Sequence, residues 1–167
     1  MKDNILVVFW TILLVCLFVI TSRNSRADNW VMFGGPMLLD SGPSGKAKIF
    51  GARTQVKRIM GVYSSDEIGG WVDNRPGMSN SLYYAMKLGV EPGQKDGIYG
   101  KAYIGPALIS STDDALGGHL QFNEDIGFGV RDGDTQMGIT YKHFSCGFLC
   151  SPNLGKDWIV FEMGLVW

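Results

Sequence analysis

Apolar and polar side chains alternate, residue by residue, over much of the chain beyond residue 28. In residues 81–91, one face of this pattern carries Leu82, Tyr84, Met86, Leu88 and Val90. Residues 120–131 repeat it with Phe122, Ile126, Phe128 and Val130. Successive side chains of a β-strand point to opposite faces, so a period of two indicates strands with one apolar face. Because no helical stripe accompanies it, the pattern predicts an all-β protein.

Eight segments show this alternation, and the connections between them alternate in length. The segments are residues 30–38, 45–53, 55–64, 81–91, 97–109, 120–131, 135–145 and 157–167. Connections after the first, third, fifth and seventh segments are long, and those after the second, fourth and sixth are short. This arrangement is typical of outer-membrane proteins and predicts an eight-stranded antiparallel up-and-down transmembrane β-barrel. An exported soluble sandwich or lipocalin-like barrel would also contain such short strands.

The last segment favours a membrane protein over a soluble one. One of its faces carries Ile159, Phe161, Met163, Leu165 and Trp167. An unbroken apolar face that ends on an aromatic residue suits a strand in contact with lipid. The opposite face includes Glu162, and Lys142 of the preceding segment faces the same interior, so we expect these two residues to form an ion pair inside the barrel.

The N-terminus has the features of an export signal. Residues 5–20 are almost wholly apolar and follow a positive charge. The small residues Ser25 and Ala27 suit cleavage after Ala27. We therefore expect residues 1–27 to be a signal peptide and residues 28–167 to form the outer-membrane barrel. An uncleaved anchor is the alternative, since the apolar run is long for a signal and slightly short for a membrane span.

Charge and cysteine content narrow the possible functions. Residues 1–27 hold three of the 15 basic and one of the 16 acidic residues, which leaves a net charge of 12 − 15 = −3 for the remaining domain. A negative charge argues against a nucleic-acid partner. Cys146 and Cys150 remain as an even pair in an oxidising compartment, which suits a small-loop disulfide. Their spacing matches no zinc or iron–sulfur site, so we expect no metal and no cofactor.

His143, Ser145 and Asp157 stand at the long-loop end of the last two segments. The first two continue the outward face of Tyr141, and Asp157 continues that of Ile159. Opposite positions on paired strands lie about 5 Å apart, so the three side chains can meet. Ser145 would attack an ester carbonyl, with His143 as general base and Asp157 orienting the imidazole. The spacing alone equally allows polar side chains that are solvated at the headgroup level.

Two stretches near the C-terminus resemble a known family. They are GPALISSTDDALGGHLQFNEDIGFGVRDGD and KHFSCGFLCSPNLGKDW. The part that contains them, residues 98–167, resembles the outer-membrane lipid A 3-O-deacylases, the PagL family, and the likeness is weak before residue 98. The resemblance implies a barrel with His143 as base, Ser145 as nucleophile and Asp157 as the acid, where some members carry Glu. It also implies that Asn153 helps to form the oxyanion hole.

Two departures from the family pattern fall in the loop that follows Ser145. Cys146 stands where the family usually has Asn, and Gly147-Phe148 stands where it usually has Ala-Gly. The first removes a side-chain amide, and the second alters the backbone near the oxyanion hole. A disulfide between Cys146 and Cys150 would stiffen this same loop.

The resemblance implies an enzyme that removes an ester-linked (3-O) acyl chain from the lipid A of lipopolysaccharide. Its partners would be the outer leaflet and the bacterial outer membrane itself. A non-catalytic small outer-membrane barrel with a structural or surface-interaction role is the alternative function. A soluble exported barrel that binds a hydrophobic ligand is a third.

Overall fold

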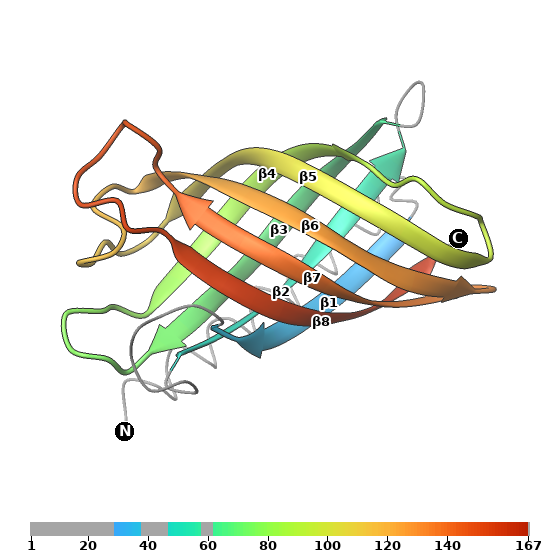
Figure 1. Cartoon of the computed structure of the whole chain (residues 1–167), viewed down its shortest axis with the longest axis horizontal. Coiled ribbons are helices and arrows are strands. Elements are labelled where there is room, and N and C mark those ends of the chain that lie inside the picture. The colour runs from blue at the N-terminus through green and yellow to red at the C-terminus, as the bar shows by residue number, and fades with distance from the viewer. Residues whose placement is uncertain (1–28, 38–46, 58–61, 167) are drawn as a thin grey trace.

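Eight antiparallel strands close into one barrel, in which each strand pairs with its neighbours in sequence and the last pairs with the first (Figure 1). The strands are β1 (Asn29–Pro36), β2 (Ala47–Lys57), β3 (Val62–Asp73), β4 (Ser81–Val90), β5 (Gly97–Ile109), β6 (Leu120–Asp132), β7 (Thr135–Ser145) and β8 (Lys156–Val166). This computed structural model describes residues 29–37, 47–57 and 62–166. The expected signal peptide, residues 1–27, and the terminal Trp167 lie outside the described residues. The predicted fold class is confirmed.

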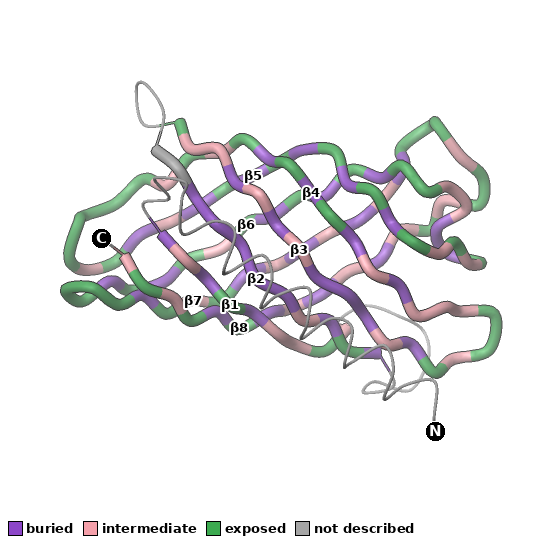
Figure 2. Tube along the Cα trace, turned by 180° about the vertical axis from the view of Figure 1, so that it is seen from behind, coloured by how far each residue is buried: buried purple, intermediate pink, exposed green. Residues whose placement is uncertain are grey.

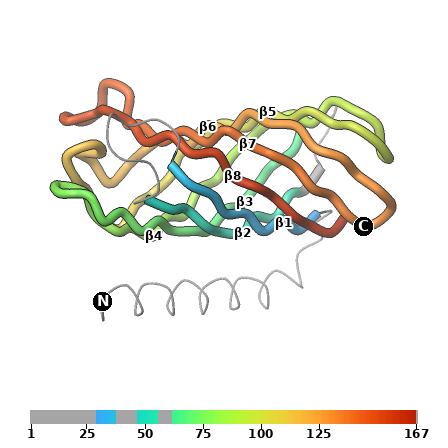
Figure 3. Tube along the Cα trace, turned by 60° about the horizontal axis from the view of Figure 1, so that its bottom comes forward, coloured from blue at the N-terminus to red at the C-terminus, as the bar shows by residue number. Residues whose placement is uncertain are grey.

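The connections between strands differ in length at the two ends of the barrel. Residues 74–80, 110–119 and 146–155 form the β3–β4, β5–β6 and β7–β8 loops, whereas the β6–β7 turn consists of residues 133–134. Figure 3 shows the three longer loops together at one end, which we call the long-loop end, with the C-terminus at the other. The predicted alternation of loop lengths is confirmed for these connections.

Large apolar side chains cover the outer wall of the barrel. Buried and exposed positions alternate along the strands (Figure 2). The most exposed apolar side chains of the strands are Met32, Leu88, Ile98, Leu108, Ile126, Phe128, Met137, Phe161 and Met163. An apolar surface that encircles the protein suits lipid rather than water. The described residues contain no helix that is long and apolar enough to cross a membrane.

Ionised side chains fill the middle of the barrel. Lys142 Nζ lies 2.7 Å from Glu67 Oε1 and 2.8 Å from Asp125 Oδ1. Lys87 Nζ lies 2.6 Å from Glu67 Oε2 and 2.5 Å from Asp125 Oδ2. Each lysine therefore bridges both carboxylates, and each carboxylate accepts from both lysines. This central ion cluster joins β3, β4, β6 and β7.

A second group of charges lies beside the central ion cluster. The guanidinium of Arg53 donates two hydrogen bonds of 2.9 Å to the Glu162 carboxylate, which also accepts one from Lys101. The expected ion pair between Lys142 and Glu162 is therefore wrong, although both residues are buried. The alternation along β7 and β8 fixes only which side of the barrel wall a residue faces. Which inward charges meet depends on where β2 and β5 place theirs across the interior.

The third strand departs from its predicted position. We expected residues 55–64 and left residues 65–73 in a long loop, whereas β3 is Val62–Asp73 and β2 extends to Lys57. Polar Ser65 and Glu67 occupy buried inward positions on β3. Polar Ser64 and Asp66 fall on its outer face, so the apolar alternation of this strand is too weak to be recognised.

Removing one lysine of the central ion cluster should strongly destabilise the barrel. In Lys142→Met, the buried carboxylates of Glu67 and Asp125 lose a counter-charge each, and we expect a loss of about 3–5 kcal/mol in the free energy of unfolding. Urea titration of the refolded protein in lipid vesicles measures it. The control is Lys95→Met, since Lys95 is an exposed residue of the β4–β5 loop. Equal unfolding midpoints for the two variants would contradict a stabilising role for the cluster.

Candidate active site

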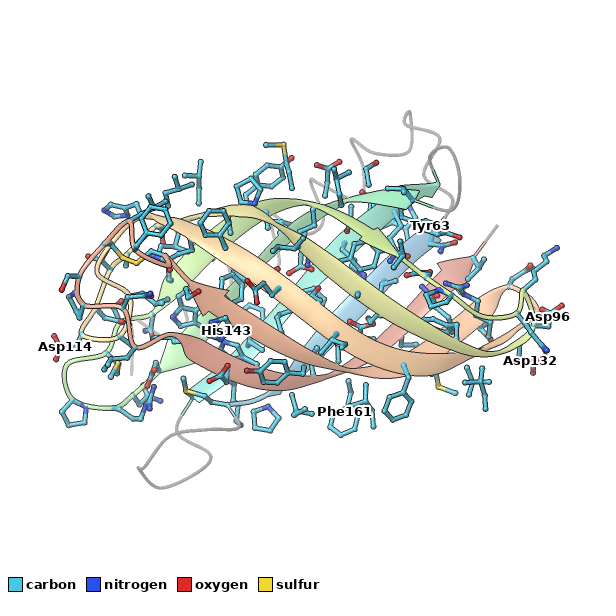
Figure 4. The ribbon with its side chains drawn as sticks, turned by 45° about the horizontal axis from the view of Figure 1, so that its top comes forward. Tyr63, Asp96, Asp114, Asp132, His143 and Phe161 are labelled. Carbon is cyan, nitrogen blue, oxygen red and sulfur yellow. A yellow bond between two sulfur atoms is a disulfide. The ribbon has the colours of Figure 1, made fainter. Side chains whose placement is uncertain are left out.

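His143 and Asp157 form a hydrogen-bonded pair on the outer wall. They are directly opposite each other in the register of β7 and β8. Nδ1 of the imidazole lies 2.7 Å from Oδ1 of the carboxylate, and the side chains are 24% and 18% exposed. Figure 4 shows His143 closer than Phe161 to the long-loop end, where Asp114 lies. The pair therefore lies at the end of the apolar wall that is nearest to the long loops.

Ser145 is the last residue of β7 and lies on the same side of the wall as His143. It is half-buried and pairs with Phe122 of β6. Within the described part of the chain, its hydroxyl makes no hydrogen bond, to His143 or to any other group. The structure therefore brings His143 and Asp157 into contact and leaves Ser145 two positions further along the strand. Because Nδ1 is bonded to Asp157, Nε2 is the imidazole nitrogen that remains for a serine hydroxyl.

Residues directly next to these three along the strands point inward and anchor the strands. Phe144, Lys156 and Trp158 are completely buried. Phe144 and Trp158 pack against Trp71, with ring centroids 5.4 and 6.3 Å away. Since neighbouring residues of a strand point to opposite faces, inward anchors force His143, Ser145 and Asp157 outward. The expected outward orientation is thus found for all three.

A polar contact at the long-loop end ties the β5–β6 loop to the start of β8. Lys156 Nζ lies 2.6 Å from Asp113 Oδ2 and 3.2 Å from Asp73 Oδ2. Burial by itself raises the pKa of the Asp113 carboxyl, but the hydrogen bonds from Lys156 and from the backbone N–H groups of Ser79 and Leu116 hold it below its usual value. Asp113 is therefore ionised, and its charge balances Lys156 directly beside Asp157.

The β7–β8 loop is held by a disulfide and by an asparagine. Cys146 and Cys150 are bonded to each other, with their Cα atoms 5.8 Å apart. Oδ1 of Asn153 accepts a hydrogen bond of 3.0 Å from the backbone N–H of Cys146, and Nδ2 donates one of 2.6 Å to the carbonyl of Gly147. The amide of Asn153 is therefore fixed in orientation. Its Nδ2 carries a second hydrogen that the carbonyl of Gly147 does not use.

Two residues near the pair were missed by sequence reasoning. Gly155 has a φ of +74°, and a Cβ there would lie 2.7 Å from Cε1 of His143, so its backbone packs directly against the imidazole. Tyr141 donates a hydrogen bond from its hydroxyl to the same Oδ1 of Asp157. Tyr141 could have been found from the sequence, because it shares the outward face of its strand with His143.

A hydrophobic groove of about 680 Å³ runs along the outer wall over β1, β6, β7 and β8. Its lining includes Met32, Gly34, Phe128, Met137, Ile139 and Phe161. Gly34 is the register partner of Phe161, and its lack of a side chain leaves space beside that ring. Ile139 precedes His143 by four residues on β7, about 13 Å along a strand. The groove thus lies on the same face of the barrel as the His143–Asp157 pair.

The described residues contain no group of three or more His, Cys, Asp and Glu side chains arranged to hold a metal ion. The side chains at this site are an imidazole, a carboxylate and a nearby hydroxyl. Such groups suit acyl transfer through a serine.

Comparisons with known proteins agree with this architecture. A family model described as lipid A 3-O-deacylase (PagL) matches residues 46–166. A solved structure, described as the crystal structure of the outer membrane enzyme PagL, has a TM-score of 0.64 and 21% identity, and the alignment covers 83% of this chain and 99% of that one. A search of curated proteins finds no match. The structural likeness supports the fold, and the family match extends well before residue 98, where the resemblance was weak. The chain therefore belongs to the lipid A 3-O-deacylase (PagL) family.

Proposed function

We propose that this protein is a serine esterase of the bacterial outer membrane that hydrolyses the 3-O-linked acyl chain of lipid A. Membership of the deacylase family supports the substrate. The observation that carries the mechanism is the His143–Asp157 hydrogen bond on the outer wall, two residues from Ser145. A catalytic pair that faces outward is useful only for a substrate that lies in the membrane beside the barrel.

The reaction proceeds by two acyl transfers. Nε2 of His143 takes the hydroxyl proton of Ser145 as Oγ bonds to the ester carbonyl carbon. The tetrahedral intermediate then breaks its bond to the sugar oxygen, which leaves with the proton from His143. Water attacks the acyl-serine in the same way and releases the fatty acid. Asp157 accepts from Nδ1–H throughout and stabilises the imidazolium.

Asn153 is the residue that we propose stabilises the negative charge of the intermediate. Oδ1 accepts from the N–H of Cys146, so Nδ2 cannot exchange places with it by rotation of the amide without losing that bond. The second hydrogen of Nδ2 is a preorganised donor, which is the requirement of an oxyanion hole. The Cys146–Cys150 disulfide holds the same loop and so limits its movement.

The groove on the outer wall suits the acyl chain that is removed. With the ester at Ser145, near the edge of the apolar wall, the chain extends along β7 and β8 toward Ile139 and Phe161. The sugar and phosphates of lipid A then remain at the headgroup level. This orientation matches that of lipid in the outer leaflet.

A non-catalytic barrel is the second candidate function. The observation that favours it is the missing hydrogen bond between Ser145 and His143 in the described structure. Catalytic hydrogen bonds often form only when substrate is bound, so the free geometry is compatible with an enzyme. The two functions are separated by activity alone.

Ser145→Ala should abolish deacylation. We expect kcat to fall about 10⁴-fold or more, because the nucleophile is removed. Mass spectrometry of lipid A after incubation with each refolded protein measures loss of one hydroxy-acyl group. Ser151→Ala, in an exposed position of the same loop, is the matched control and should retain activity. If folded wild-type protein leaves lipid A intact while a known deacylase cleaves it in the same vesicles, the protein is not an esterase for this substrate.

Gly34→Leu should change the preference for acyl-chain length. A Cβ at Gly34 meets neighbouring atoms at 3.5 Å or more, so the new side chain fits the backbone and projects into the groove. We expect kcat/KM to fall about tenfold for long chains relative to short ones. Gly100→Leu is the control, since Gly100 of β5 also has room for a side chain and lies outside the groove. Unchanged selectivity in Gly34→Leu would place the acyl chain elsewhere.

A further inference from the structure

Two donors meet on one oxygen of the Asp157 carboxylate. Oδ1 accepts from Nδ1 of His143 at 2.7 Å and also from the hydroxyl of Tyr141. Among the residues that the structure describes, these are the two donors that bond to this carboxylate. The orientation of Asp157 therefore depends on Tyr141 as well as on the imidazole.

The register of β7 and β8 explains how Tyr141 reaches the acid. His143 is opposite Asp157, and Tyr141 is opposite Ile159, so Tyr141 and Asp157 are diagonal neighbours on the outer wall. Diagonal neighbours lie about 7–8 Å apart at the backbone, a distance that a long side chain with a terminal polar atom can span. The phenol ring lies along the wall and brings its hydroxyl to the carboxylate.

A second donor matters because Asp157 has little else to hold it. It is partly exposed, and its carboxylate can rotate about its last torsion unless hydrogen bonds hold it. Rotation would move Oδ1 away from Nδ1 and toward the lipid headgroups, where other donors compete for it. A phenol is protonated at neutral pH and donates one hydrogen bond in a fixed direction. It therefore holds the oxygen that the imidazole uses.

We infer that Tyr141 is a positioning residue of the proposed esterase, which acts on the reaction through Asp157 rather than through the substrate. The inference rests on the proposed function. It adds a fourth side chain to the catalytic group and orders the chain of contacts as Tyr141, Asp157, His143 and Ser145. Tyr141 also lies between the His143–Asp157 pair and the hydrophobic groove on the outer wall, so a direct contact with substrate is the alternative role.

The barrel offers a matched control for this hydrogen bond. Tyr84 donates from its hydroxyl to Oδ1 of Asp66 at 2.7 Å, and both residues lie on the outer wall of β3 and β4. The pair has the same chemistry and the same diagonal relation, since Asp66 is opposite Met86. It is on other strands than the catalytic pair. Tyr84→Phe therefore removes an equivalent contact without touching the site.

Tyr141→Phe tests the positioning role. We expect kcat to fall about tenfold with KM nearly unchanged, the size of effect of one hydrogen bond to a charged group. Tyr84→Phe should keep the wild-type values. In an Asp157→Ala background, adding Tyr141→Phe should cause no further loss, because residues that act through one another are not additive. Kinetics are measured on lipid A in vesicles with proteins that show equal heat-modifiability.

Each result has a distinct meaning. A wild-type kcat in Tyr141→Phe, with an active wild-type enzyme, overturns the positioning role and leaves the esterase intact. A raised KM at constant kcat, or a further loss in the Asp157→Ala background, also overturns it and assigns Tyr141 to substrate binding. An inactive wild-type protein removes the proposed function itself. A tenfold lower kcat in Tyr141→Phe, with no further loss when the same change is added to Asp157→Ala, establishes that Tyr141 acts through Asp157.

Discussion

Each charged side chain in the ion clusters inside the barrel lies against opposite charges, and the packing of the whole interior depends on this pairing. Glu67 and Asp125 share Lys87 and Lys142, which ties four strands together. Arg53 of β2 lies 3.8 Å from Asp125 and connects that cluster to Glu162 of β8 and, through it, to Lys101 of β5. The lipid-facing wall is largely apolar, and these ionised groups are enclosed in the interior. The strands can therefore close into this barrel only when the charges that they enclose are balanced.

The packing of the interior also decides which way the proposed catalytic residues face. Along β7 and β8, inward residues such as Phe144 and Trp158 pack in the interior, and the residues that alternate with them must point to lipid. A shift of one residue in the register would turn His143 and Asp157 inward and leave the charged interior on the membrane side. The position of the candidate site thus follows from the packing of the interior, which leaves the outer face to these three side chains.

The loop after Ser145 shows how this chain accommodates its departures from the family pattern. Where the family usually has Asn, the backbone N–H of Cys146 bonds to Oδ1 of Asn153, and the Cys146 side chain forms the disulfide with Cys150. Both contacts restrain the same short segment. The amide that is proposed to stabilise the oxyanion is therefore oriented by backbone and covalent contacts rather than by a neighbouring side chain.

Sequence alternation alone determined the all-β class, the number of strands, the bounds of β5 and β7, and the outward face of His143, Ser145 and Asp157. These follow because a strand has a fixed period of two, which each segment displays locally. Strand β3 was misplaced because polar Ser64 and Asp66 interrupt its outer face. The expected partner of Lys142 was wrong because contacts across the interior depend on the tilt and register of all strands. Only the tertiary structure placed Gly155 against the imidazole and the Tyr141 hydroxyl on Asp157. A contact between residues that are distant in sequence leaves no local pattern, since it depends on where the closed barrel brings their side chains.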